Sequence, residues 1–320
     1  MHPILTFVFG QPVHLYAVAI ATGFVLGVVG AARNAHRFGY SKDMVLDLCW
    51  WLLVMGLVGS RIAFILTNWE QYYYPCTDVE YYNTLKLERP LLDPDCWRLL
   101  RFWSGGLVFY GGPIASIATL FVFMRREKLP SLPVADLIIP YLALGQAFGR
   151  LGCFAAGCCF GKQSHGALAV HFPPDSMAWE QHVRAGLIGP DSPTSLGVHP
   201  TQIYDAATGF LLFGALLLIR SRRKFDGQVL ASWLVLYPIV RSLNELFRGD
   251  DDRKFLTEIV IEPLNRLLGF APGSVTFLST SQFISIGVIA LGVTLYLRMR
   301  HRPLAAVGVP PPEPVSAESN

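Results

Sequence analysis

The stretch GQAFGRLGCFAAGCCFGK, residues 145–162, places Arg150 and three cysteines in a run that is otherwise apolar enough to lie in a membrane. The chain of 320 residues is 52% hydrophobic and only 15% charged, whereas a soluble domain carries about 25% charged residues. This shortage of charge indicates an integral membrane protein. An ionisable residue at the bilayer centre costs at least ~2.5 kcal/mol, so it usually faces a cavity, a partner or a substrate. Arg150 is therefore a candidate site residue, the alternative being an arginine near the end of its span that snorkels to the headgroups.

Apolar runs near the length that crosses a bilayer, about 20 residues, recur along the chain. They cover about residues 14–31, 44–66, 105–124, 134–156, 203–220, 228–247 and 279–298. We expect an all-α, polytopic integral membrane protein with seven transmembrane helices. No internal repeat divides these spans into inverted halves, which argues mildly against a transporter.

The basic loops predict the orientation, because Lys and Arg accumulate in cytoplasmic loops. Basic segments follow the first, third, fifth and seventh spans, namely AARNAHRFGYSK, RREK, RSRRK and RMRHR. The N-terminus is therefore expected outside and the C-terminus in the cytoplasm. The net charge of +3 reflects these loops and gives no indication of nucleic-acid binding.

One membrane domain is expected over residues 1–302, with external insertions at about 67–104 and 161–200. The proline-rich, polar residues 303–320 have too little apolar surface to fold and predict a disordered cytoplasmic tail. The start MHPILTFVFG lacks the basic region of a cleavable signal peptide. The first span is therefore expected to remain in the mature protein.

The cysteines fall into two groups. Cys76 and Cys96 lie in the first external insertion, where they form either a disulfide or two free thiols. Cys153, Cys158 and Cys159 lie at or near membrane depth. Their C-x4-C-C spacing does not match the two cysteine or histidine pairs of common zinc sites. We expect small, polarizable packing residues there, and neither a metal nor another cofactor.

A polar stripe runs along the sixth span, in LYPIVRSLNELFRGDD. Tyr237, Arg241, Glu245 and Arg248 are spaced i, i+4, i+8 and i+11, which is one face of a helix. Arg241 and Glu245 could form a purely structural ion pair. Together with Arg150, however, the group has an excess of positive charge. Because guanidinium groups bind phosphate in a bidentate manner, this predicts a site for an anionic phospholipid headgroup, and a headgroup transferase.

Three further stretches lie beside predicted spans. PVHLYAVAI contains His14 and Tyr16, HPTQIYDA contains His199, and FWSGGLVFYGGPIA contains Gly105, Gly106 and Tyr110. Glycine pairs allow a helix to approach either a ligand or another helix closely. Spacing alone does not distinguish these two uses.

Several motifs together resemble the phosphatidylglycerol:prolipoprotein diacylglyceryl transferase family. They are VHLY, GSRIAF, WSGGLVFYGG, VADLIIPYLALGQAFGRLG, HPTQIYD and VRSLNELFR, and their order and positions match over about residues 10–300. The resemblance breaks down in the external insertions. It implies a seven-span enzyme of the bacterial inner membrane that works on the periplasmic side. Such an enzyme moves the diacylglyceryl group of phosphatidylglycerol onto the lipobox cysteine of a prolipoprotein and releases glycerol phosphate.

The resemblance also implies roles for individual residues. Arg150 looks like the family's essential arginine, and Arg241 and Glu245 like its second arginine and a nearby glutamate. With Tyr110 they form the expected catalytic set. The expected substrate-binding residues are His14, Tyr16, Gly105, Gly106, Cys153, Cys158, Gly161, His199, Tyr237 and Arg248.

This chain departs from the family pattern at three of these positions. Cys153 and Cys158 stand where the family usually has asparagine and glutamate, and Tyr110 replaces a histidine. Tyrosine, with a pKa of about 10, is a poor base at neutral pH. We therefore expect the arginines to activate the incoming thiol by lowering its pKa, while Tyr110 orients a substrate or donates a hydrogen bond. The alternatives are a different donor or acceptor, a nucleophilic Cys153 or Cys158, and a catalytically silent lipid-binding or interaction protein.

Overall fold

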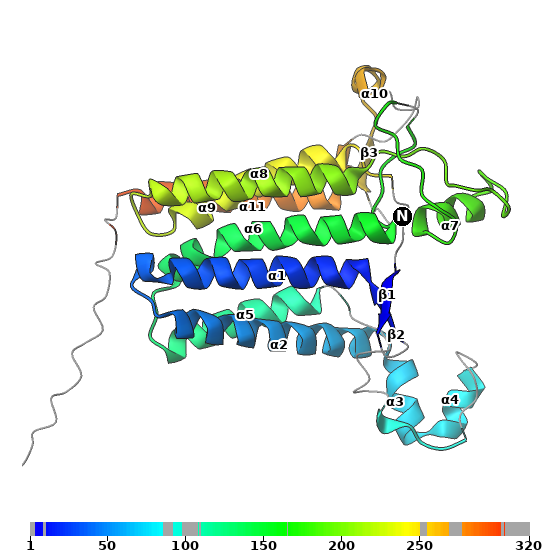
Figure 1. Cartoon of the computed structure of the whole chain (residues 1–320), viewed down its shortest axis with the longest axis horizontal. Coiled ribbons are helices and arrows are strands. Elements are labelled where there is room, and N and C mark those ends of the chain that lie inside the picture. The colour runs from blue at the N-terminus through cyan, green and yellow to red at the C-terminus, as the bar shows by residue number, and fades with distance from the viewer. Residues whose placement is uncertain are drawn as a thin grey trace, which may run out of the picture. The chain divides into compact units, whose positions relative to one another are not determined.

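The computed structural model describes residues 4–8, 11–85, 92–97, 108, 110–164, 166–249, 255–268, 277–301 and 304. Gly105, Gly106 and, apart from Leu304, the predicted tail 303–320 lie outside these residues. The chain forms two compact units, one of residues 1–39 and 132–320 and the other of residues 40–131. Each unit is built mainly from long helices (Figure 1).

The first unit contains five long helices, which run side by side (Figure 1). These are α1 (Leu15–Asn34), α6 (Ser131–Ala156), α8 (Thr201–Ser221), α9 (Gln228–Glu245) and α11 (Thr280–Met299). The shorter elements are β1 (Ile4–Val8), β2 (Gln11–His14), η1 (Ala35–Phe38), α7 (Met177–Arg184), β3 (Phe255–Ile259), α10 (Glu262–Leu268) and β4 (Phe277–Ser279). The all-α prediction omits two short antiparallel pairs, β1 with β2 and β3 with β4. These pairs are too short to give a clear alternating pattern in the sequence.

Small residues bring the helices of the first unit together. A methyl group on Gly209 of α8 would lie 2.9 Å from the Ala147 side chain of α6. One on Gly292 of α11 would lie 2.8 Å from the Leu234 side chain of α9. Backbones approach this closely only where side chains are small, which is typical of helix packing in membranes.

A carboxylate of α6 fixes the start of α9. Asp136 is fully buried and accepts hydrogen bonds from the backbone nitrogens of Gly227, at 2.8 Å, and Leu230, at 2.9 Å. The first N–H groups of a helix have no partner within it, and its positive end attracts negative charge. Asp136 therefore stabilises α9 and joins it to α6.

The second unit contains α2 (Lys42–Thr67), α3 (Trp69–Thr77), α4 (Val79–Leu85) and α5 (Gly111–Arg126). Helices α2 and α5 pack closely, since a methyl group on Gly56 would lie 2.9 Å from the Ser116 hydroxyl. Arg61 of α2 is buried, and its guanidinium lies 5.0 Å from the centre of the Tyr72 ring. The intramembrane arginine of the GSRIAF motif thus has a cation–π partner.

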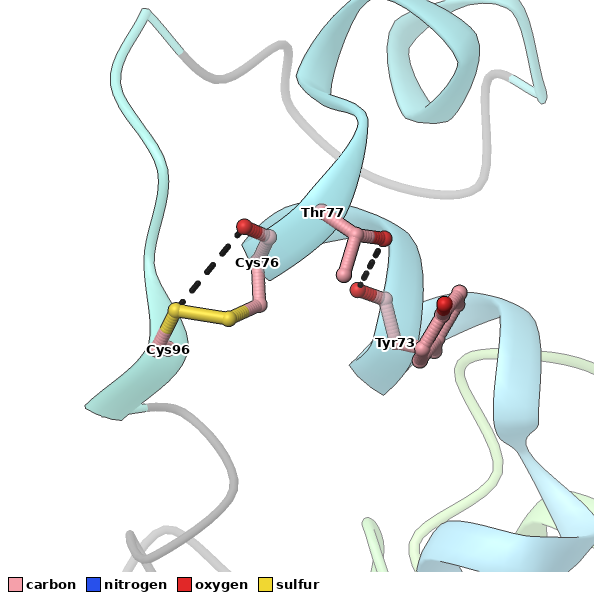
Figure 2. The surroundings of a disulfide bond; sticks show 4 residues. All are labelled: Tyr73, Cys76, Thr77 and Cys96. Atoms are coloured by element: carbon pink, nitrogen blue, oxygen red, sulfur yellow. Dashed lines mark hydrogen bonds between the residues drawn. A yellow bond between two sulfur atoms is a disulfide. The ribbon is translucent and has the colours of Figure 1, made fainter.

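Cys76 and Cys96 form a disulfide, which decides between the two sequence-based alternatives (Figure 2). The bond joins the last turns of α3 to the segment around residue 96. Nearby, the Thr77 hydroxyl donates a hydrogen bond of 3.0 Å to the Tyr73 carbonyl within α3 (Figure 2). A disulfide is typical of an oxidising compartment.

Five of the described helices are long and apolar enough to cross a membrane: α1 with η1, α2, α6, α8 and α11. Their surfaces expose large apolar side chains such as Leu211, Leu218 and Leu291, as expected of helices that face lipid. Helices also occupy the other two predicted spans. However, α5 has only 16 residues, and α9 ends with Arg241, Asn244 and Glu245, which lower its hydropathy.

Candidate active site

The polar groups of the first unit meet where α6 ends. Arg150 and Cys153 lie in the last two turns of α6, Asp205 lies in the second turn of α8, and Arg241 and Glu245 lie in the last turns of α9. Successive helices run in opposite directions, so these helix ends can share one end of the bundle.

Arg150 forms an ion pair with Asp205. Its Nε lies 3.3 Å from Asp205 Oδ2, and the two side chains are 26% and 10% exposed. This ion pair involves the Nε atom of Arg150, while its two terminal nitrogens, Nη1 and Nη2, are not part of the pair. Sequence analysis missed Asp205, although a carboxylate directly after HPTQIY in an apolar run is itself unusual. The arrangement holds Arg150 in place while it can still bind an anion.

Arg241 and Glu245 form a second ion pair, with 2.8 Å between Nη1 and Oε2. Glu245 is buried, and Arg241 is largely buried. The neighbouring Asn244 side chain donates a hydrogen bond of 3.2 Å to the Thr201 carbonyl. This bond joins the end of α9 to the start of α8.

The turn after α6 is held against α8. The Gln202 side chain donates a hydrogen bond of 2.7 Å to the Cys158 carbonyl, and the Thr201 hydroxyl donates one of 2.8 Å to the Cys159 carbonyl. The three sulfur atoms of Cys153, Cys158 and Cys159 lie within 4.8 Å of one another. The two hydrogen bonds from side chains of α8 therefore hold Cys158 and Cys159 beside the last turn of α6.

Gly161 lies where two segments leave no room for a side chain. A methyl group there would lie 2.6 Å from both the His199 side chain and the Phe247 carbonyl. The Gly161 backbone pairs with Arg248 as an isolated antiparallel bridge. The structure thus brings together Gly161, His199 and Arg248, three of the predicted site residues.

His199 packs beside Tyr204 and Phe247. Its Nδ1 lies 3.3 Å from the Tyr204 hydroxyl, and the two rings of His199 and Phe247 are 5.4 Å apart. Burial, together with the charge of Lys162, lowers the pKa of His199 from its usual value. The neutral imidazole is therefore favoured, which suits a packing or hydrogen-bonding role.

The predicted residues of α1 and α9 have different surroundings. Tyr16 packs beside Gly152 of α6, and its ring lies 3.0 Å from where a side chain on Gly152 would begin. His14 is exposed at the start of α1. Tyr237 stacks on Trp233, with ring centres 5.2 Å apart. Tyr16 thus lies against the helix that carries Arg150, while the described contacts of Tyr237 are aromatic and apolar.

Tyr110 belongs to the second unit. It occupies the N-cap position of α5, and its side chain is 75% exposed. An exposed phenol at a helix start can contact a bound molecule. Its hydroxyl is well suited to donate a hydrogen bond and poorly suited to act as a base.

Arg150, Arg241 and Arg248 carry three positive charges, and Asp205 and Glu245 carry two negative charges, which leaves an excess of one positive charge. Arg248 lies just beyond the end of α9, where its backbone pairs with Gly161 after the end of α6. Such a group favours an anion that can reach several guanidinium groups. A separate apolar hollow of about 350 Å³ lies near the opposite end of α9, between Ala231 and Tyr296, and contains none of the candidate residues.

Comparison with known sequences agrees with the motifs. A sequence model of the family described as "Prolipoprotein diacylglyceryl transferase" matches residues 3–298. The chain is 26% identical over 296 residues to the phosphatidylglycerol--prolipoprotein diacylglyceryl transferase of Clostridium tetani, covering 92% of this chain and 97% of that protein. It is 29% identical over 290 residues to the protein of that name from Bordetella parapertussis, covering 89% and 90%.

Proposed function

Because the chain belongs to the prolipoprotein diacylglyceryl transferase family, we propose that it transfers the diacylglyceryl group of phosphatidylglycerol to prolipoproteins at the site around Arg150 and Arg241. The observation that carries this proposal is the pair of arginines, each held by its own carboxylate at one end of the helix bundle. A lipid-binding protein without chemistry has little need for so many costly charges in an apolar region. This favours the enzyme over the silent lipid-binding alternative.

The donor's phosphate is the group that the arginines recognise. Arg150 and Arg241, with Arg248 nearby, neutralise the phosphodiester as it binds. As the reaction proceeds, the bond between the glyceryl carbon and the phosphate oxygen breaks, and a second negative charge develops on the departing glycerol phosphate. Guanidinium groups that are already oriented stabilise this charge in the transition state more than in the ground state. Asp205 and Glu245 act as positioning residues for the two arginines.

The acceptor is the lipobox cysteine of a prolipoprotein signal peptide. Its thiol loses a proton, and the thiolate sulfur attacks the glyceryl carbon, so that one C–S bond replaces one C–O bond. The excess positive charge lowers the pKa of a nearby thiol and favours the thiolate. The family resemblance implies that Tyr110 orients a substrate through its hydroxyl and that Gly105 and Gly106 bind a substrate. Tyr16, His14, Gly161, His199 and Tyr237 contribute to the walls of the site around Arg150 and Arg241.

The proposed membrane arrangement has seven spans, with α5 and α9 crossing in addition to the five longer or more apolar helices. Residues 1–302 form the membrane domain, with insertions at about 67–104 and 161–200. The N-terminus lies outside, the C-terminus lies in the cytoplasm, and the site opens toward the periplasmic side of the bacterial inner membrane. The basic loops and the Cys76–Cys96 disulfide support this orientation. A short, tilted or polar helix can cross where neighbouring helices surround it.

The test is transfer of radiolabelled diacylglyceryl from phosphatidylglycerol to a lipobox peptide by the purified full-length protein. We expect label on the peptide with the wild-type protein. Arg150→Ala and Arg241→Gln should each lower the rate on the order of 10²-fold or more, because each removes a donor to the developing charge. Arg184→Gln is the matched control, since Arg184 is exposed on α7 and pairs with Glu180 at the surface.

Two results would contradict the proposal. A wild-type protein that binds phosphatidylglycerol vesicles but transfers no label would be a lipid-binding protein or an enzyme for another acceptor. If Arg184→Gln and Arg150→Ala lose the same amount of transfer activity, the loss is not specific to the site. The arginines would then act through protein stability alone. Thermal unfolding of each variant in detergent separates loss of fold from loss of chemistry.

A further inference from the structure

The turn that ends α6 brings the cysteines of this segment together. Gly157 adopts a left-handed conformation, with φ of 69°. Its N–H bonds to the Phe154 carbonyl at 3.2 Å, and the Cys158 N–H bonds to the Cys153 carbonyl at 3.2 Å. This pair of bonds is the Schellman motif, in which the side chains of the two outer residues meet. The outer residues here are Cys153 and Cys158, so the C-x4-C spacing with glycine between them produces a contact.

The third cysteine is held by a strained backbone. Cys159 has a φ of 58°, a conformation that non-glycine residues rarely adopt. Such a conformation persists only where the surroundings fix it. The hydrogen bonds from Thr201 and Gln202 of α8 to the carbonyls of Cys159 and Cys158 provide this support. The turn is therefore fixed in the shape that points three thiols at one another.

The spacing of the sulfur atoms suits a metal ion. All three Sγ atoms lie within 4.8 Å of one another. A metal with bonds to sulfur of about 2.3 Å holds its thiolates about 3.8–4.0 Å apart in tetrahedral or trigonal geometry. The present separations exceed this spacing by at most about 1 Å. All three residues are half-buried, which excludes much of the solvent but leaves a route of entry.

The chemistry of the ligands selects the class of metal. The cluster consists of thiols alone, and thiolates prefer Zn(II) and Cu(I) to Mg(II) or Ca(II), which require oxygen ligands. Three thiolates around a divalent ion carry a net charge of −1, and around a monovalent ion −2. Arg150 lies three residues before Cys153 on α6, which places the two side chains on the same side of the helix. Its guanidinium thus offsets part of the charge of the complex.

We propose that Cys153, Cys158 and Cys159 bind a thiophilic d10 metal ion, Zn(II) or Cu(I), through three thiolates at the end of α6. Each coordinating thiol releases its proton to solvent, and no electron is transferred. This differs from the expectation of packing residues, because the linear spacing C-x4-C-C does not reveal how the Schellman turn and α8 fold the segment. The proposed metal site adjoins the proposed lipid site through Arg150, but its test needs no lipid substrate.

The experiment uses the purified full-length protein, with its free thiols reduced, and Cd(II) as a spectroscopic probe. Titration should produce a thiolate-to-cadmium charge-transfer band that saturates at one ion per chain. Cys153→Ser, Cys158→Ser and Cys159→Ser should each weaken binding by at least about 10²-fold. Cys49→Ser, in α2, and the double variant Cys76→Ser/Cys96→Ser should leave the titration unchanged. The affinities for Zn(II) and Cu(I) are then compared. Each ion is added separately to the Cd(II)-loaded protein, with a chromogenic chelator to set the free Cu(I) concentration, and the ion that displaces Cd(II) at the lower free concentration is the preferred one.

A second measurement does not depend on the variants. Zn(II) or Cu(I) should protect these three thiols of the wild-type protein from alkylation, as read by mass spectrometry of their peptides. The proposal is overturned if no charge-transfer band forms, if the three serine variants bind as the wild type does, or if the metal gives no protection. A disulfide between two of the three cysteines that persists in the presence of Zn(II) would also overturn it.

Discussion

At the scale of single residues, Asp205 is the carboxylate that holds Arg150 in place. We expect Asp205→Asn to lower kcat for diacylglyceryl transfer on the order of 10-fold, which corresponds to about 1.4 kcal/mol. The reason is that an arginine without its counterion no longer keeps the orientation that stabilises the leaving group. The KM for phosphatidylglycerol should change less, because the positive charge of the site is retained.

Two variants control this prediction. Asp205→Glu restores the carboxylate and should recover part of kcat, whereas Asp191→Asn, at an exposed loop position, should leave it unchanged. Steady-state kinetics with radiolabelled lipid make the comparison. A drop in unfolding temperature that accompanies the full loss of activity in Asp205→Asn would assign Asp205 a structural role instead.

Gly161 is a second residue for which we predict the effect of a substitution, because a single added methyl group has no room there. Gly161→Ala places a methyl group 2.6 Å from the Phe247 carbonyl and from the His199 side chain. We expect a loss of about 1–3 kcal/mol in the free energy of unfolding, typical of overpacking. Transfer activity should fall as well, because the bridge from Gly161 to Arg248 is displaced.

The matched control is Gly214→Ala on α8, where the added methyl group meets nothing within 4 Å. An alanine in an open helical position should be neutral or stabilising by up to about 1 kcal/mol. Denaturant unfolding in detergent measures both variants. Equal stability of the two would show that the segments around Gly161 can move apart.

At the scale of the helices, Asp136 joins α6 to the first turn of α9. Asp136→Ala leaves the Gly227 and Leu230 N–H groups without their acceptor. We expect a loss of about 1–3 kcal/mol in the free energy of unfolding, since these donors are in a buried region. Glu180→Ala, which breaks an exposed i,i+4 ion pair on α7, should cost no more than about 0.5 kcal/mol. A similar cost for both variants would contradict this role for Asp136.

The positions of the helices follow closely from the sequence. Helices lie at all seven predicted ranges, because apolar length and helical periodicity are local properties. The strand pairs, and the reduced length of α5, were not predicted. Short strands form only when a partner is available, and the end of a helix depends on its contacts as much as on its sequence.

At the scale of the whole molecule, the seven-span arrangement predicts which surfaces a membrane-impermeant maleimide reaches in intact cells. Cysteines introduced at the exposed positions Glu80, Asp191 and Val260 should be labelled. Cysteines at the exposed positions Glu127 and Lys224 should be labelled only after permeabilisation. The unmodified chain gives the background. Labelling of Glu127→Cys in intact cells would exclude α5 as a span, and labelling of Lys224→Cys would exclude α9.

The sequence by itself determined the family, the helical ranges, the basic loops and the Arg241–Glu245 pair of α9, because each depends on residues that are near one another along the chain. The predicted polar stripe does not extend to Arg248, which lies beyond the end of α9. Only the tertiary structure decided that Asp205 pairs with Arg150, that His199 closes over Gly161, and that Thr201 holds Cys159 beside Cys153. These contacts join segments that are far apart along the chain. Their formation depends on how the helices pack, which local patterns do not specify.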